Sequence, residues 1–296
     1  MSSFSSRNPG FYKRLWTLSL QVILQNLITF SLGLIDTFMV SQLGNKEMAA
    51  VTTANVPVFL LISIVFGVQS GLGILVSQYW GKGDTRSINR AIGVAAFIGT
   101  GITVVLAVVF FLFPVQVMDL LSNSHELSLL GAPYLRVIGF SYVFNMLSSI
   151  YASAQRSVEN TTFGMKLFGL STLVNTGLNY LLIFGKLGFA PMGVQGAAIA
   201  TLVSQLLNSL LILLGFAVCL RRDGSHPQWA LHFERITRWA YGGMILPILL
   251  SEFLWSLGQN VESAVYGHLG TANLAAYTLT CPIQSLIVGA LSGLSA

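Results

Sequence analysis

The stretch SLGLIDTFMVSQLGNKEMAAVTTANVP, residues 31–57, decides the fold because a related copy follows later in the chain. Residues 256–282 read SLGQNVESAVYGHLGTANLAAYTLTCP, so both segments open on Ser-Leu-Gly. With single-residue adjustments, both also contain an acid beside a hydroxyl, a Leu-Gly pair, an Ala-Ala pair and a proline, at Asp36-Thr37, Leu43-Gly44, Ala49-Ala50 and Pro57 and at Glu262-Ser263, Leu269-Gly270, Ala275-Ala276 and Pro282. A repeat with a period of about 225 residues predicts two similar structural units.

The composition around the repeat is that of a membrane protein. Hydrophobic residues make up 54% of the 296 residues and charged residues 8%, against about a quarter charged in soluble domains. The charges fall in short clusters between apolar runs of roughly 20 residues or more, the length that an α-helix needs to cross a bilayer. The sequence therefore predicts an all-α, polytopic helical membrane protein with eight spans, at about 15–41, 51–79, 91–113, 133–155, 163–185, 193–220, 239–266 and 272–296.

The repeat groups these spans into bundles. Six spans fill one period, and because six is even, the second copy enters the membrane in the same sense as the first, as in parallel-repeat transporters. We expect a complete six-helix bundle over residues 1–220, a cytoplasmic loop between lobes at 221–238, and the first two helices of a second bundle over 239–296. Because the sequence stops inside an apolar run, we expect it to be the N-terminal two-thirds of a longer protein.

The basic residues predict the orientation, because cytoplasmic loops hold an excess of Lys and Arg. With the N-terminus inside, twelve of the fifteen basic residues fall on the inner side and three, Lys46, Arg136 and Lys186, on the outer side. This bias predicts a multi-pass protein of the plasma or inner membrane with a cytoplasmic N-terminus. It also explains the net charge of +5 without a nucleic-acid partner.

Catalytic patterns are missing from the sequence. All four histidines fall in predicted loops, no spacing typical of metal ligands occurs, and there is no phosphate-binding loop for ATP. We therefore expect a protein that is not an enzyme and uses no cofactor. A membrane receptor or an intramembrane enzyme stays a less favoured interpretation, which the repeat and the lack of catalytic groups argue against.

The first span carries a candidate ion-binding carboxylate. A charged side chain in hydrocarbon costs about 2.5–3.5 kcal/mol, so such residues usually face the interior of a bundle and mark an ion or substrate path. Asp36 ends a stripe of polar and small residues whose spacing predicts a single helix face, formed by Gln21, Gln25, Thr29 and Gly33.

Two other spans repeat this spacing. Asn175 and Asn179 stand four residues apart on the fifth span, and Thr201 and Gln205 do so on the sixth. Side-chain oxygens of Asp, Asn and Thr are hard ligands that suit Na⁺, while a desolvated Asp can instead hold H⁺. The competing interpretation is that these amides and hydroxyls bond one helix to another.

Two further acids lie inside predicted spans. Glu252 falls near the midplane of the seventh span, and Glu262 is the repeat partner of Asp36. We take both, with Gln25, as candidates for substrate binding or coupling. For Glu262 the alternative is a merely interfacial position, and for Gln25 a hydrogen bond between helices.

Several short motifs together resemble the multidrug and toxic compound extrusion (MATE) family. They are Leu34-Ile35-Asp36-Thr37, Leu43-Gly44 leading to Ala49-Ala50, Gly81-Lys82-Gly83-Asp84, and the segment GVQGAAIAT at 193–201. The resemblance implies twelve spans in two six-span bundles and exchange of Na⁺ or H⁺ for organic cations. It also implies that Asp36, Asn175, Asn179 and Thr201 form the cation site of the first bundle, although some members have Asp at the position of Asn179.

The resemblance implies multidrug efflux of small organic cations or other xenobiotics, with the lipid bilayer as surroundings and no obligate protein partner apparent. The alternative with a similar two-bundle plan is a lipid-linked oligosaccharide flippase. A flippase for anionic pyrophosphate lipids should hold Lys or Arg near the midplane of its cleft, and the predicted spans place none there. A cationic or neutral substrate is therefore favoured.

Overall fold

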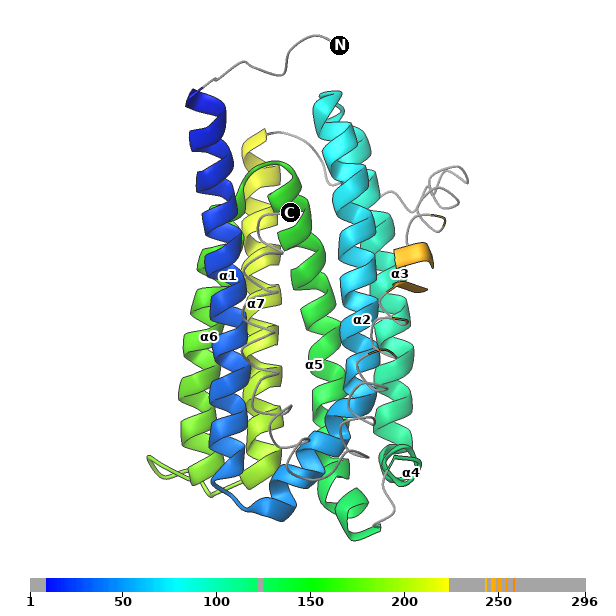
Figure 1. The fold of residues 1–296 in the computed structure, drawn as a ribbon, viewed down its shortest axis with the longest axis vertical. Helices are drawn as coiled ribbons and strands as arrows, with labels where there is room; N and C mark the ends of the chain where they lie inside the picture. The colour runs from blue at the N-terminus through cyan, green and yellow to red at the C-terminus, as the bar shows by residue number, and fades with distance from the viewer. Residues whose placement is uncertain are drawn as a thin grey trace.

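The protein is an all-helical membrane protein (Figure 1). A computed structural model describes residues 9–121 and 125–223, with scattered positions between 243 and 258. Within this part, the chain forms α1 (Pro9–Ser41), α2 (Asn45–Gly81), α3 (Thr85–Leu112), α4 (Pro114–Asp119), α5 (His125–Ser157), α6 (Thr161–Phe184) and α7 (Gly193–Asp223). All but α4 contain a segment long and apolar enough to cross a membrane.

These six long helices follow the first six predicted spans in order. They extend several residues beyond the predicted ends: α2 begins at Asn45 instead of 51 and α5 begins at His125 instead of 133. The last of them, α7, continues to Asp223, three residues into the predicted inter-lobe loop. The short helix α4, which begins at Pro114, was not predicted. The two spans expected at 239–266 and 272–296 fall almost entirely outside the described residues.

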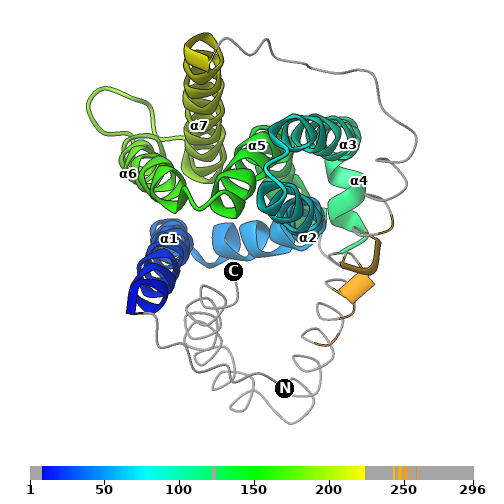
Figure 2. The same cartoon turned by 90° about the horizontal axis from the view of Figure 1, so that it is seen from above.

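Helix α5 is the centre of the bundle and packs against α2, α3 and α7 (Figure 2). One core cluster joins α2, α3 and α5 and includes Val68, Ala95 and Met146. A second cluster lies nearer the other end and includes Leu61, Leu135 and Ala198. Helix α1 packs mainly against α6 and is the least buried of the six spans. It is therefore a peripheral helix held chiefly along one side.

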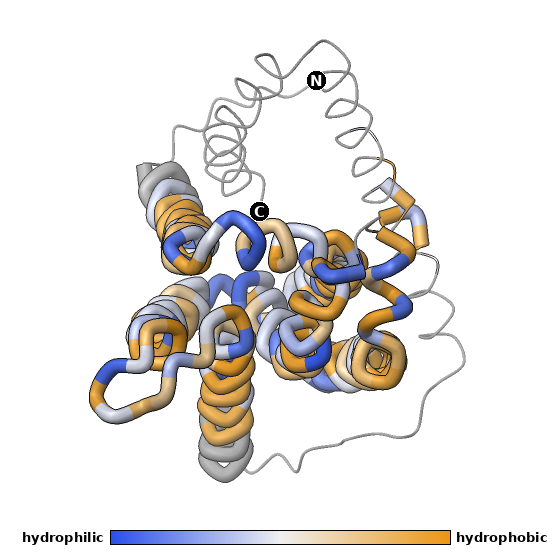
Figure 3. Tube along the Cα trace, turned by 90° about the horizontal axis from the view of Figure 1, so that it is seen from below, coloured by the Kyte–Doolittle hydropathy of each residue, from blue (hydrophilic) through white to orange (hydrophobic). Residues whose placement is uncertain are grey.

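The second helix bends where its first turns meet the rest (Figure 1). Pro57 lies inside α2 and is buried; a proline removes one backbone hydrogen bond and its ring clashes with the preceding turn, so it kinks a helix. Hydrophobic residues dominate the long helices, and hydrophilic stretches gather at the loops and where helices converge (Figure 3). This is the pattern of a bundle that faces lipid outside and polar partners inside.

A close approach of α6 and α7 depends on one glycine. A Cβ atom placed on Gly196 would lie 2.8 Å from the carbonyl carbon and oxygen of Leu182 and 3.1 Å from the backbone nitrogen of Ile183. All three neighbours are backbone atoms, which cannot rotate away as a side chain can. Gly196 therefore sets the spacing of these two helices one turn or so from Thr201.

We expect Gly196→Ala to lower the thermal stability of the detergent-solubilised protein. The added methyl group must push α7 away from α6, and overpacking of this kind typically costs about 1–3 kcal/mol. Gly177→Ala on α6 is the matched control, because a Cβ there meets nothing within 4 Å and alanine favours a helix. Equal melting temperatures for the two variants would contradict this account of the helix contact.

Candidate cation site

The carboxylate of Asp36 meets two buried asparagines inside the bundle. Asn179 donates through Nδ2 to Asp36 Oδ1 at 2.5 Å and to Asn175 Oδ1 at 2.9 Å. Asn179 and Asn175 are 0% and 1% exposed. Because they stand four residues apart on α6, both face α1 from successive turns. The contact thus joins α1 to α6 through one charged and two neutral groups.

Helix α7 completes the site with two hydroxyls. Asn175 Nδ2 lies 3.3 Å from both Thr201 Oγ1 and Ser204 Oγ. With the Asn175 amide turned by 180°, its Nδ2 lies 3.0 Å from Asp36 Oδ1 and its oxygen accepts from Thr201 and Ser204. In this orientation Nδ2 faces Asn179 Nδ2, so a hydrogen bond to Asp36 replaces the one from Asn179. An amide can therefore present either a donor or an acceptor to the centre of this cluster.

The cluster contains one oxygen that accepts no hydrogen bond. Asn179 Oδ1 is buried, and no residue in the described part of the chain donates to it. A buried acceptor left without a donor costs roughly 1–3 kcal/mol, so a cation or a water is the natural partner of this atom. Together with the carboxylate of Asp36 and the oxygens of Asn175 and Thr201, it forms a set of hard oxygen ligands. The residues present therefore fit a small cation.

The polar stripe on α1 is only partly directed at α6. Gln21 accepts a hydrogen bond from Thr161, and Gln25 is buried with its amide 3.3 Å from where a Cβ of Gly164 would lie. Thr29 and Gly33, further along the stripe, are exposed, whereas Gln25 is buried. At about 100° per residue, a four-residue step turns by about 40°, so Thr29 and Gly33 have rotated past the line through Gln21 and Asp36.

The other predicted residues have different outcomes. Gln25 Oε1 is buried and finds no partner among the described residues, and Gln205 lies beside the site on α7 without bonding to Asn175. Ser204, three residues after Thr201, takes that place instead. The sequence signal for Ser204 was its i+3 spacing from Thr201, which is as compatible with one helix face as the four-residue spacing of Gln205. Glu252 and Glu262 lie outside the described residues.

The site differs from a transition-metal centre. Among the residues that the structure describes, no three His, Cys, Asp or Glu side chains come close enough to share a metal ion. The ligands gathered around Asp36 are one carboxylate, two amides and two hydroxyls. Oxygen sets of this kind suit hard cations, whereas imidazole and thiolate suit zinc or copper.

Comparison with known proteins gives a consistent result. A protein-family model described as MatE matches residues 22–181, more than half of the chain. The probable multidrug resistance protein YoeA of Bacillus subtilis is 24% identical over 94% of this chain and 61% of its own length. The probable multidrug resistance protein NorM of Thermotoga maritima is 24% identical over 94% of this chain and 60% of its own length. The chain thus spans about three-fifths of these curated relatives.

Solved structures share the fold at low sequence identity. A mutant of the MATE transporter VcmN of Vibrio cholerae superposes with a TM-score of 0.85 at 22% identity, covering 95% of this chain and 63% of that one. A MOP-superfamily transporter of Pyrococcus furiosus superposes with a TM-score of 0.83 at 21% identity, covering 95% and 62%.

We expect Asp36→Asn and Asn179→Ala to be energetically coupled. Residues in one hydrogen-bonded network typically show interaction free energies of about 0.5–3 kcal/mol in a double-mutant cycle, because the second change removes a contact already broken by the first. Thermal unfolding of the two single variants and the double variant in detergent measures this coupling. Strictly additive losses would show that the two side chains do not interact.

Proposed function

Because this chain belongs to the MatE family of membrane transporters, we propose that it acts in secondary active export, moving organic cations out of the cell in exchange for inward Na⁺ or H⁺. MATE transporters are not enzymes, in agreement with the missing catalytic patterns. The candidate site around Asp36 is where we place the coupling ion.

The observation that carries the proposal is the meeting of Asp36, Asn179 and Asn175 from two helices in the bundle interior. Placing a carboxylate in a membrane-spanning helix costs free energy. An asparagine at position 36 would bond α1 to α6 equally well without that cost, so helix packing alone does not explain the charge. Binding a cation uses the negative charge itself. The charge is therefore better explained by ion binding than by helix packing.

The chemistry of the site allows either coupling ion. Na⁺ would be held by the Asp36 carboxylate, the Asn175 and Asn179 amide oxygens and the Thr201 hydroxyl. A proton would instead be held on the Asp36 carboxyl, which could then donate to a neighbouring amide oxygen such as the unpartnered Asn179 Oδ1. Both ions neutralise the same charge, so both could drive the same rearrangement.

The distribution of acids supports a positively charged cargo. Among the acids in the part of the chain that the structure describes, Asp36 alone lies more than one turn inside a helix. The others lie in loops or within a turn of a helix end, at Glu47, Asp84, Asp119, Glu126, Glu159 and Asp223. A half-buried negative charge at Asp36 repels anions and attracts organic cations as well as the coupling ion, which favours a cationic substrate.

The peripheral position of α1 suggests how ion and cargo are coupled. Helix α1 packs mainly on α6, and the Asp36–Asn179 hydrogen bond is a polar tie between these two helices. An ion that replaces this tie would change how α1 sits against α6. Exchange follows if the ion and the organic cation stabilise different positions of the helices.

We expect Asp36→Asn to abolish ion-driven export while leaving membrane insertion intact. The amide keeps the size and polarity of the side chain but holds neither Na⁺ nor a transferable proton. Everted membrane vesicles with an imposed Na⁺ or H⁺ gradient, and ethidium as the organic cation, measure the effect. Unchanged gradient-driven ethidium uptake by this variant would disprove the coupling role.

The control is Asp84→Asn, which removes an acid outside the spans. Asp84 caps α3: its Oδ1 accepts from the backbone nitrogen of Ser87 at 3.0 Å and its Oδ2 from the Ser87 hydroxyl at 2.6 Å. These hydrogen bonds lower the pKa of Asp84, so it is ionised at neutral pH. Asn is an equally good capping residue, and transport should be retained.

The identity of the ion can be tested by binding alone. If Na⁺ is the coupling ion, a hundred-fold excess over its Kd should stabilise the purified 296-residue chain by about 2.7 kcal/mol against choline chloride of equal ionic strength. Asp84→Asn should gain the same increment and Asp36→Asn none. Equal stabilisation of Asp36→Asn by Na⁺ would place the ion elsewhere. Absence of any Na⁺ effect on the unaltered chain would assign the site to H⁺.

A further inference from the structure

A second group of buried polar side chains lies deeper in the bundle on α7. Asn208 is 1% exposed, and neither its Oδ1 nor its Nδ2 has a hydrogen-bond partner in the described part of the chain. The Oε1 atom of Gln205 is likewise buried without a partner. Two amides in this state within one helical turn are unusual, because buried polar groups are almost always paired.

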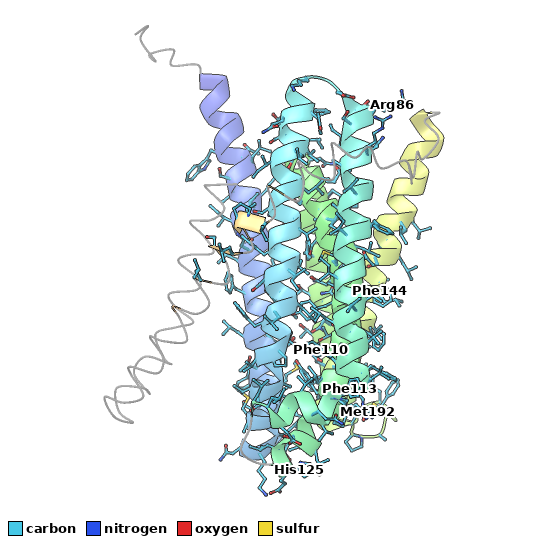
Figure 4. The ribbon with its side chains drawn as sticks, turned by 90° about the vertical axis from the view of Figure 1, so that its right-hand side faces the viewer. Arg86, Phe110, Phe113, His125, Phe144 and Met192 are labelled. Carbon is cyan, nitrogen blue, oxygen red and sulfur yellow. The ribbon has the colours of Figure 1, made fainter. Side chains whose placement is uncertain are left out.

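Helix geometry brings these amides together with two serines. Gln205, Asn208 and Ser209 stand at positions i, i+3 and i+4 and therefore share one patch of α7. Ser209 Oγ lies 3.3 Å from Ser148 Oγ of α5 and donates to the Phe144 carbonyl at 2.8 Å. Figure 4 shows Phe144 about midway between Arg86 at one end of the bundle and His125 at the other. The patch thus lies near mid-height.

The patch continues the polar contacts of the Asp36 site. Ser204, which bonds to Asn175, stands one turn before Asn208 on α7, and its carbonyl accepts from the buried Ser171 of α6 at 3.4 Å. Asn208 lies about 10 Å along the helix from Thr201. Buried polar groups therefore follow α7 from the candidate cation site toward the end of the bundle that carries Arg86.

The energetics favour a ligand for this patch. An amide buried without any hydrogen bond costs about 1–3 kcal/mol for each unmade bond in proteins. Gln205 and Asn208 together leave three such atoms without a partner in the described part of the chain. Leu or Ala could fill the same space without this cost. The groups are all neutral, so they match a monovalent cation that keeps part of its water shell better than a divalent cation, which selects carboxylates.

We propose that Gln205, Asn208, Ser209 and Ser148 form an inner station for a partly hydrated monovalent cation, through which the coupling ion passes between the Asp36 site and the end of the bundle that carries Arg86. The proposal rests on the proposed function in taking the Asp36 site as the other end of the path. The amide oxygens of Gln205 and Asn208 and the serine hydroxyls supply the ligands, and Asn208 Nδ2 donates to the water that accompanies the ion.

Silver ion tests the station, because Ag⁺ is a small monovalent cation that reacts with thiols. Cys219 and Cys281 are first replaced by Ala, and Ser209→Cys is introduced in that background. Purified protein is exposed to silver nitrate without chloride, and the remaining thiol is counted by maleimide labelling after denaturation. The matched control is Ile212→Cys, because Ile212 lies on the same helix at 5% exposure against 4% for Ser209.

We expect the Ser209→Cys thiol to react at least about tenfold faster than the Ile212→Cys thiol, since one lost buried hydrogen-bond partner of about 1.4 kcal/mol corresponds to a factor of ten. Adding Asn208→Leu to Ser209→Cys should slow the reaction by a similar factor, and Asn208→Asp, which keeps size and polarity, should not. Equal rates of silver reaction at positions 209 and 212, or no effect of Asn208→Leu on the rate, would overturn the proposal of an inner station.

A further variant separates this proposal from the proposed function. Asp36→Asn in the Ser209→Cys background should keep the fast silver reaction, because Asp36 is not a ligand of the station. If Asp36→Asn exports ethidium normally while the Ser209→Cys thiol reacts fast, the ion role of Asp36 fails and the inner station stands. If the thiol at position 209 reacts as slowly as the thiol at position 212 while Asp36→Asn abolishes export, the inner station fails and the ion role of Asp36 stands.

Discussion

The half-buried carboxylate of Asp36 constrains the arrangement of three helices. Asp36 must have a hydrogen-bond donor in an apolar setting, and Asn179 supplies it at 2.5 Å. Asn179 is fully buried and bonds in turn to Asn175, which reaches Thr201 and Ser204 on α7. These contacts require α6 and α7 to lie close together at that level, and Gly196, which has no side chain, permits the approach. The hydrogen-bonded network that starts at Asp36 therefore depends on the close backbone packing at Gly196.

The arrangement of α1 follows from the same constraint. Most of the bundle is held by α5, which packs on α2, α3 and α7, whereas α1 rests chiefly on α6. A helix with so little apolar packing depends more on its polar ties, at Gln21 with Thr161 and at Asp36 with Asn179. Neutralising Asp36 would weaken one of these ties and leave the core clusters intact. The proposed ion site is thus placed where a small change in charge can act on one helix without unfolding the rest.

The sequence predicted the helical class and the order of the six described spans, and it singled out the residues that the structure brings together around Asp36. Both inferences were possible because long apolar runs, and an acid inside such a run, can be read directly from the sequence. It did not predict the ends of helices such as α2, since turns beyond the hydrocarbon are polar and look like loops. It also missed α4, whose six residues merge with the preceding apolar run. Ser204 and Asn208 share a face of α7 with Thr201 at spacings of three and seven residues. Spacing alone did not single them out, because burial decides which residue on a face meets a partner. Spacing likewise did not reveal that Thr29 and Gly33 are exposed while Gln25 on the same stripe is buried.

Asparagine at positions 175 and 179 has a physical advantage that a second carboxylate lacks. When no cation is bound, Asp36 needs donors, and the Asn179 Nδ2 group provides one. When a cation is bound, the site needs acceptors, and the same side chains carry Oδ1 atoms, one of them without a donor in the described residues. Turning the Asn175 amide by 180° directs its Nδ2 to Asp36 Oδ1 and its oxygen to Thr201 and Ser204. Rotation of an amide thus exchanges donor for acceptor without moving a helix, so the site can stabilise both the charged and the neutralised state of Asp36. An aspartate at position 179 would instead bring two negative charges together whenever the ion leaves, which raises the cost of the ion-free state.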